Sequence, residues 1–235
     1  MKVTLIVATL NEIEGMKVMM PRINRDWCDQ IIILDGGSTD GTIEYAKENG
    51  YFVYVQQKKG FRNAYTEVLP FIEGDVIITF SPDGNSIPEL IPELIKKMES
   101  GGYDMVIASR YAEGAKSEDD DFMTGFGNWL FTRIVNFLHG GSYTDSMVIY
   151  RAYRTQIIYD LELHKDEGYA MAEKLFNTLI SWEPLLSVRA AKRKLKVGEI
   201  PGDEPPRIGG ERKLKVLKWG AAFLFQFIRE VFYWR

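Results

Sequence analysis

The chain has very few of the residues that build disulfides and metal cages. Its 235 residues include one cysteine, Cys28, and two histidines, His139 and His164. A single cysteine excludes an intramolecular disulfide and a zinc site built from several cysteines, and it suits a reducing compartment. The two histidines have no partner at a spacing typical of metal ligands. These absences predict a protein that resides in the cytoplasm.

The chain also has no surplus of positive charge and no long apolar run. It contains 29 lysines and arginines against 33 aspartates and glutamates, a formal net charge of -4. A general nucleic-acid binder needs a basic surplus to neutralise phosphates, so this balance argues against that class. The uncharged stretch 219–228 is much shorter than the roughly 20 apolar residues that span a bilayer. The segment 2–8 lacks the basic region and cleavage site of a signal peptide and is predicted to be a strand.

Short β-branched runs alternate along the chain with longer segments of helical period. Strands are predicted at 2–8, 31–34, 51–55, 75–80 and 104–109, and helices near 12–20, 40–49, 62–72 and 88–99. Because several strands are apolar throughout, the sheet is predicted to be mainly parallel, with helices on both faces. The predicted fold class is therefore α/β, with ligands bound at the carboxyl edge of the sheet.

Polar loops follow four of the predicted strands, and the loop 35–42, DGGSTDGT, is the most unusual of them. Its glycines let the backbone turn tightly and approach a ligand, and Asp35 can accept hydrogen bonds from a base or ribose. The spacing is not G-x-G-x-x-G, so a dinucleotide site is not supported. A structural turn has the same composition. We predict either a nucleotide-binding loop or a turn at this position.

Taken in order, the loops resemble those of the family 2 glycosyltransferases of the GT-A fold. The matching stretches are Thr9–Glu12 to T-x-N-E, 35–42 to D-D-G-S-T-D-G-T, and Ser81–Asn85 to the metal-binding D-x-D loop. The stretch 207–214, RIGGERKL, is similar to the R-x-x-G-x-S-K-L signature of dolichyl-phosphate mannose synthase and related polyprenyl-phosphate glycosyltransferases. The resemblance covers essentially the whole chain. It implies one GT-A domain over 1–213, with a nucleotide-sugar half at 1–110, an acceptor half at 111–213 and a basic amphipathic helical tail at 214–235.

The resemblance also implies an activity and a set of site residues. The activity is inverting transfer of a sugar from a nucleoside-diphosphate sugar, with Mg²⁺ or Mn²⁺ as cofactor. The implied donor-binding residues are Thr9, Asn11, Glu12, Asp35, Gly37 and Lys59, and the metal ligands are Asp83 and Asn85. The implied catalytic carboxylates are Asp83, Asp145 and Glu173. Because arginine suits bidentate contacts with phosphate, Arg110, Arg207 and Arg212, with Lys213, are predicted to bind the acceptor; surface ion pairs are the alternative for the arginines.

Two positions depart from the family pattern. Gly36 replaces the second aspartate of the first turn, and Ser81 replaces the first aspartate of D-x-D. Mg²⁺ accepts only one or two protein carboxylates when phosphates and waters complete its shell, so Asp83 with Asn85 can suffice. A simple β-turn would also explain 82–85. The departures leave a catalytically silent sugar-nucleotide-binding module as an alternative.

The acceptor is predicted from charge. Between Arg189 and Lys218 lie ten lysines and arginines against four acidic residues, and no aromatic residue suited to stacking on bases interleaves them. This favours a polyprenyl phosphate or lipid-linked acceptor over nucleic acid. The alternative is a polysaccharide hydroxyl, which would need Asp145 or Glu173 as a general base.

The segment from 214 onward is predicted to form a helix with two adjacent apolar stripes. The first stripe is Leu217, Ala221, Leu224, Phe225, Ile228 and Phe232, and the second is Val216, Trp219, Phe223, Phe227, Val231 and Trp234. Such a helix is typical of peripheral binding to a membrane, here the cytoplasmic face. Packing on a second subunit, as in a homo-oligomer, or on the protein itself are the alternatives.

Overall fold

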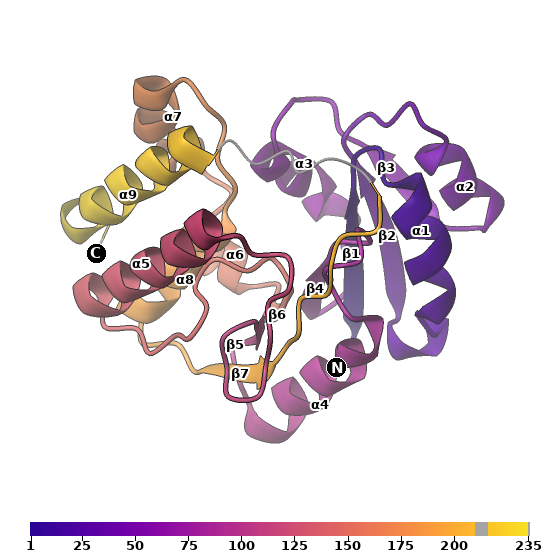
Figure 1. Ribbon diagram of the computed structural model, residues 1–235, viewed down its shortest axis with the longest axis horizontal. Helices are drawn as coiled ribbons and strands as arrows, with labels where there is room; N and C mark the ends of the chain where they lie inside the picture. The colour runs from indigo at the N-terminus through magenta and orange to yellow at the C-terminus, as the bar shows by residue number, and fades with distance from the viewer. Residues whose placement is uncertain (210–215, 235) are drawn as a thin grey trace.

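A seven-stranded sheet runs through the protein, whose computed structural model describes residues 1–209 and 216–234 (Figure 1). The strands are β1 (Val3–Thr9), β2 (Gln30–Asp35), β3 (Phe52–Val55), β4 (Val76–Phe80), β5 (Met105–Ser109), β6 (Arg151–Arg154) and β7 (Val197–Pro201), in the order β3-β2-β1-β4-β6-β5-β7. Strand β6 is antiparallel to both neighbours, and the other pairs are parallel. Six strands therefore end at one edge of the sheet, as the predicted mainly parallel α/β fold requires.

The sequence analysis did not predict β6 and β7. Strand β6 reads RAYR, and its first residue, Arg151, is completely buried. The guanidinium of Arg151 donates to the main-chain oxygen of Val148 and to the hydroxyl of Ser187. Those bonds compensate a buried charge that no strand pattern anticipates. Strand β7, VGEIP, contains a glycine and a proline, which weaken any strand prediction.

Nine helices surround the sheet within the described ranges. They are α1 (Ile13–Met19), α2 (Thr42–Glu48), α3 (Phe61–Val68), α4 (Ile91–Gly101), α5 (Phe122–His139), α6 (Ile157–Asp160), α7 (Ala170–Phe176), α8 (Glu183–Lys192) and α9 (Val216–Tyr233). The predicted helix 62–72 ends as a 3₁₀ turn at Leu69–Phe71, and the predicted helix 88–99 begins with one at Pro88–Leu90. Each of these turns contains a proline, which lacks the N–H of a regular helix.

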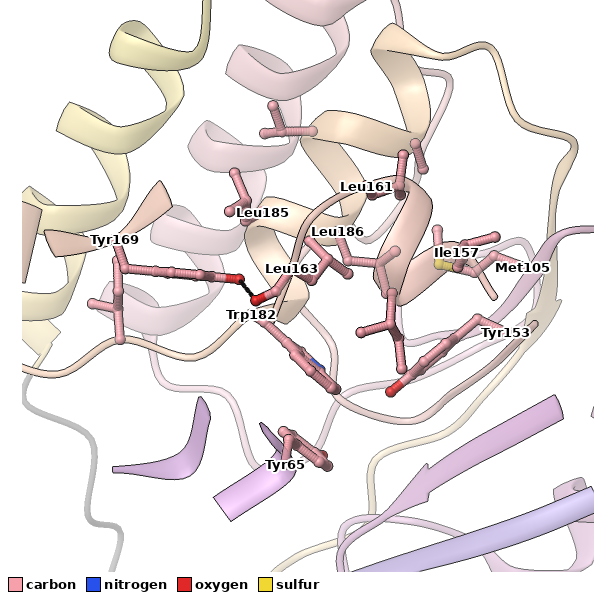
Figure 2. Packing of buried hydrophobic residues seen from close by; sticks show 14 of the residues in the cluster. Tyr65, Met105, Tyr153, Ile157, Leu161, Leu163, Tyr169, Trp182, Leu185 and Leu186 are labelled. Atoms are coloured by element: carbon pink, nitrogen blue, oxygen red, sulfur yellow. Dashed lines mark hydrogen bonds between the residues drawn. The ribbon is translucent and has the colours of Figure 1, made fainter. Parts of the chain in front are cut away.

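The sheet separates two hydrophobic clusters. Alternate residues of the central strands point to opposite faces, so Ile77 of β4 belongs to one cluster and Ile78 to the other. Helices α1, α2 and α4 contribute to the second cluster, and α3, α6, α7, α8 and α9 to the first. Figure 2 shows the first cluster, in which Tyr65 of α3 stacks on Trp182 with ring centroids 4.7 Å apart. Both helical layers hold the sheet edge in a fixed position.

Helix α9 packs on the body of the protein. It contacts α5, α7 and α8, and its residues Phe223 and Phe227 are buried in the first cluster. Glu230 of α9 accepts hydrogen bonds from the guanidinium of Arg189 on α8 at 3.0 and 3.2 Å, and both side chains are buried. Phe223, Phe227 and Trp234 of the second predicted stripe are thus buried within the chain, whereas Val231 of that stripe is exposed. The first stripe is largely exposed. No helix within the described residues has both the length and the apolar character of a bilayer span.

Candidate active site

The loops after β1 and β2 meet at the carboxyl edge of the sheet. Thr9 ends β1, Asp35 ends β2, and the register pairs the two residues directly. The hydroxyl of Thr9 donates to the Asp35 carboxylate at 2.7 Å. This edge is where open α/β sheets bind ligands, so two of the predicted donor-side residues lie at the expected place.

Asp35 organises the turn 35–42 from the inside. Its buried carboxylate accepts hydrogen bonds from the Thr9 hydroxyl, from the N–H groups of Gly37 and Ser38 at 2.8 and 2.7 Å, and from the Ser38 hydroxyl at 2.6 Å. Gly37 has a φ of 93°, a conformation that glycine adopts at little cost. A carboxylate offers about four acceptor positions, and the turn together with Thr9 of β1 uses all of them. The contact of Asp35 with a base or ribose stays a prediction, beside this role in shaping the turn.

Asn11 and Glu12 tie the first loop to the second. The backbone of Asn11 is left-handed, with a φ of 53°, which asparagine tolerates better than most residues. Its side-chain oxygen accepts from the Thr39 N–H at 2.8 Å, and its own N–H donates to Ser38 at 2.8 Å. The N–H of Glu12 donates to the Thr42 hydroxyl at 3.0 Å. The two predicted donor loops therefore form one hydrogen-bonded unit.

Glu12 and Asp83 share one arginine, although it is 195 residues from Glu12 in the chain. The Arg207 guanidinium donates to Oε1 of Glu12 at 3.3 Å and lies 2.8 Å from Oδ2 of Asp83. The N–H of Ile208 donates to the main-chain oxygen of Asp83 at 2.7 Å. Gly84, which follows Asp83 in the chain, has a φ of 98°. A Cβ atom at this position would lie 2.8 Å from the Ile208 side chain. Arg207, predicted for the acceptor phosphate, is thus held against the predicted donor and metal residues.

Asn85 carries an unused buried oxygen beside Asp83. Its N–H donates to Oδ1 of Asp83 at 3.1 Å, whereas its own Oδ1 is buried and has no hydrogen-bond partner among the described residues. An unpaired buried amide oxygen is costly, and it is a ligand type that Mg²⁺ and Mn²⁺ prefer. In the described part of the chain, no cluster of three or more His, Cys, Asp or Glu side chains could hold a metal. The candidate metal site is therefore Asp83 with Asn85 and Ser81. These residues fit an ion whose remaining ligands are phosphate oxygens and water molecules.

Arg110 and Asp145 form a buried, two-pronged ion pair. The guanidinium donates to Oδ2 at 2.7 Å and to Oδ1 at 3.1 Å, and Oδ1 also accepts the N–H groups of Met147 and Val148. Burial alone would raise the pKa of Asp145, but the charge and hydrogen bonds of Arg110 outweigh it and hold that pKa below its usual range. Arg110 also donates to Glu204 at 3.3 Å. A carboxylate held in this way is a poor general base.

Glu173, the other predicted catalytic carboxylate, lies on α7 and is engaged in a different cluster. Its Oε2 is 3.2 Å from the guanidinium of Arg62 on α3, and its Oε1 accepts the N–H of Ile180 at 3.1 Å. The Arg62 guanidinium also lies 4.3 Å from the ring centre of Tyr169. The contacts of Glu173 and Asp145 are made with different partners, Arg62 and Arg110.

The remaining predicted cations are Lys59 and two residues outside the described ranges. Lys59 is exposed in the turn between β3 and α3, where its main-chain oxygen accepts from the Asn63 side chain at 2.7 Å. Arg212 and Lys213 lie outside the described residues. Their roles stay predictions.

A cavity of about 370 Å³ adjoins Asp83. Part of its wall is polar and is formed by Ser81, Asp83, Asn85, Arg110, Glu204 and Arg207, with Asp119, Asp120 and Asp203 adding further carboxylates. Another part is apolar and is formed by Met123 and Phe131 of α5, by Met147 and Val148, and by Trp219 and Phe223 of α9. Asp145, Glu173, Asp35 and Lys59 do not line it. The cavity offers both charged and hydrocarbon surroundings to one ligand.

Sequence reasoning missed several cavity residues. Glu204 counted only as an exception in a basic segment, yet it pairs with Arg110 and lines the cavity. Phe131 was missed because no helix was predicted over 122–139, although this segment contains many apolar residues. An acidic residue three positions before the R-x-x-G match was the available signal for Glu204.

Comparison with known proteins places the chain in a family. The model of the family described as Glycosyl transferase family 2 matches residues 4–162, more than half of the chain. A dolichyl-phosphate hexose transferase of Haloferax volcanii is 28% identical over 219 residues, covering 92% of this chain and 88% of that protein. An undecaprenyl-phosphate mannosyltransferase of Micrococcus luteus is 26% identical over 247 residues, covering 97% of this chain and 98% of that protein.

A solved structure shares the fold. Glucosyl-3-phosphoglycerate synthase from Mycobacterium tuberculosis, in complex with Mn²⁺, uridine diphosphate and phosphoglyceric acid, aligns with a TM-score of 0.67. The alignment covers 98% of this chain and 78% of that one, at 18% identity. At this identity the likeness establishes the common architecture.

Proposed function

The chain belongs to glycosyl transferase family 2, and from that premise we propose that it moves a hexose, with inversion, from a nucleoside-diphosphate sugar to a polyprenyl phosphate. It is a glycosyltransferase with the mainly parallel α/β sheet of the GT-A fold. The two relatives are named for transfer to dolichyl phosphate and to undecaprenyl phosphate. Those names make a lipid phosphate the first acceptor to consider.

The observation that carries the proposal is the mixed wall of the cavity. A polyprenyl phosphate has an ionised head and a hydrocarbon chain, and the cavity has surroundings for both. A polysaccharide acceptor has no hydrocarbon chain that could bury the apolar side chains of Met123, Phe131, Trp219 and Phe223. The apolar wall therefore favours the lipid acceptor.

The state of the two predicted bases supports the same acceptor. A hydroxyl must lose a proton as it attacks, which requires a free carboxylate within hydrogen-bond reach. Asp145 is bound to Arg110, and Glu173 is bound to Arg62. A phosphate oxygen is already ionised at neutral pH and needs no base. In the proposed reaction it attacks the anomeric carbon while the bond from that carbon to the nucleoside diphosphate breaks.

A divalent cation fits the polar wall. Five carboxylates line the cavity against the two arginines Arg110 and Arg207, so an anionic diphosphate would be repelled without added positive charge. Asp83, the orphaned oxygen of Asn85 and Ser81 would hold Mg²⁺ or Mn²⁺. When bound, the ion would neutralise charge developing on the leaving diphosphate.

The other predicted residues have supporting roles in this proposal. Glu12, Thr9 and Asn11, with the turn 35–42, would hold the nucleoside. Arg207 would contact phosphate after exchanging its present carboxylate partners, and Lys59, Arg212 and Lys213 would supply further positive charge. We also propose that the chain acts peripherally at a membrane surface, where its acceptor resides.

The test measures release of nucleoside diphosphate from a panel of UDP- and GDP-hexoses with Mn²⁺ or Mg²⁺ and a short polyprenyl phosphate. We expect release to require the lipid phosphate and the metal. Asp83→Asn should lower it at least about a hundredfold, because the charge that binds the metal is lost. Asp26→Asn, at an exposed aspartate remote in sequence from the cavity loops, is the matched control and should behave as the wild type. Release with a glycan but not with the lipid phosphate would refute the acceptor, and donor binding without release would indicate a silent binding module.

A further inference from the structure

Helix α5 carries an exposed aromatic stripe. Phe122, Phe126, Trp129 and Phe137 recur at helical spacing, and the first and last of these are 92% and 87% exposed. Phe126 lies between its neighbours in a stack, with ring centroids 6.5 Å from Phe122 and 5.8 Å from Trp129. Large exposed aromatic rows are uncommon on a free surface and mark an interaction site.

The adjacent helices continue this surface. Helix α9 packs against both α5 and α7 and lies between them (Figure 1). Leu217 and Phe232 of α9 are 80% and 78% exposed, and Met171 and Leu175 of α7 are also exposed. We call the exposed apolar residues of α5, α7 and α9 the helical face.

Within the three helices themselves the exposed charges have one sign, although exposed acidic residues precede α5 at Asp121 and α7 at Asp166 and Glu167. The exposed charged side chains of the three helices are Arg133, Lys174 and Lys218. The acidic residues of the same helices are turned inward, where Glu173 pairs with Arg62 and Glu230 with Arg189. The Arg133 guanidinium lies 5.6 Å from the ring centre of Trp129, so a cation and an aromatic ring are side by side. This combination suits the headgroup layer of a bilayer that contains anionic lipid.

The helical face adjoins the cavity through the same two helices. Met123 and Phe131 of α5 and Trp219 and Phe223 of α9 line the cavity, whereas Phe122, Phe126 and Trp129 of α5 belong to the exposed stripe. Apolar residues on one side of α5 and α9 thus line the cavity, and apolar residues on another side of the same helices are exposed on the outer surface. A hydrocarbon chain embedded in a bilayer would find an apolar route to the polar loops.

We propose that the helical face docks on an anionic lipid bilayer and that the acceptor chain enters the cavity from the bilayer between α5 and α9. The docking is inferred from the exposed residues of the helical face alone, whereas the entry route rests on the proposed function. A second copy of this chain is a poorer occupant, because a symmetric pairing would bring together two faces whose helices expose only positive charges.

The first test measures flotation of the full chain with vesicles of phosphatidylcholine, alone or mixed with phosphatidylglycerol. We expect binding to the mixed vesicles and a loss of at least about tenfold in affinity for Phe122→Ser/Phe126→Ser/Trp129→Ser, which removes the aromatic stripe. Arg133→Glu/Lys174→Glu should weaken binding to the anionic vesicles specifically. Phe52→Ser/Phe71→Ser is the matched control, since these residues are 47% and 45% exposed and their ring centroids lie 5.9 Å apart, on the part of the molecule away from the three helices (Figure 1).

The outcomes separate docking from catalysis. A stripe variant that is folded by circular dichroism but binds vesicles like the wild type would refute the docking. So would a concentration-dependent dimer that the stripe variant abolishes, because the occupant would then be a second copy. With a short polyprenyl phosphate in buffer the stripe variant should keep its turnover, and with a long acceptor in vesicles it should lose most of it. If neither acceptor supports turnover in the wild type, the proposed function fails while the vesicle result still decides the docking.

Discussion

Arginines hold the mostly buried carboxylates of this protein in place. The pairs are Arg62 with Glu173, Arg110 with Asp145, Arg189 with Glu230, and Arg207 with Asp83. Three of these carboxylates came from the sequence as catalytic candidates. The same pairing that keeps a buried acid ionised also removes it from proton transfer, unless a ligand exchanges with the arginine. Asp83 is the candidate for such an exchange, because its partner Arg207 lines the cavity.

Replacing Asp145 tests the buried pair. Asp145→Asn leaves the Arg110 charge without its two-pronged partner, so we expect a loss of about 3–5 kcal/mol in the free energy of unfolding at neutral pH. The pKa of Asp145 is lowered in the folded state, so its stabilisation is present above the usual aspartate pKa and is lost as the pH falls through the lower, folded value. Denaturant unfolding of both proteins should show the difference shrinking below about pH 4. If the two proteins differed equally in free energy of unfolding at neutral pH and well below pH 4, the lowered pKa of Asp145 would be contradicted.

Helix α9 has two different sides, and single substitutions distinguish them. Phe227 is fully buried and packs on Phe131 and Phe223, with ring centroids 6.0 and 6.4 Å away. We expect Phe227→Ala to lower the free energy of unfolding by about 3–5 kcal/mol, because it leaves a cavity. Phe232→Ala, on the exposed side of the same helix, should change it by about 0.5 kcal/mol or less.

Chemical denaturation of both variants provides the measurement. Equal effects of the two substitutions would mean that α9 does not pack as described. A large effect of Phe227→Ala alone would establish that α9 is part of the folded body. The exposed side of α9 would then remain available for the bilayer.

The packing of α9 also determines what removal of the C-terminal segment does to the whole protein. Deleting 214–235 exposes Phe131 and the other core residues that α9 covers and removes Glu230, the carboxylate partner of Arg189. Loss of the buried Phe227 ring alone costs about 3–5 kcal/mol, a large share of the 5–15 kcal/mol that holds a typical protein folded. We therefore expect the truncated chain to lose cooperative thermal unfolding, as measured by calorimetry. A truncated protein with a sharp, unchanged transition would show that α9 is dispensable for the fold.

Local patterns predicted the architecture well. The five strands and four helices expected in the N-terminal half are present. They could be predicted because apolar periodicity and turn residues are local signals, contained within a few neighbouring positions of the sequence. The turn 35–42 shows this most clearly, since Asp35 bonds residues two and three positions ahead. Strand β6 escaped prediction because its stability depends on hydrogen bonds made by the buried Arg151.

The sequence by itself determined the parallel sheet, the loops at its carboxyl edge and the family motifs that those loops carry. The tertiary structure alone decided which charged residues form ion pairs with each other. Arg207 lies beside Glu12 across 195 residues, and Arg110 and Asp145 pair across 35. It also decided which apolar stripe of α9 is buried. Helical periodicity is a local property, whereas ion pairing and burial depend on distances that exist only after the chain has folded.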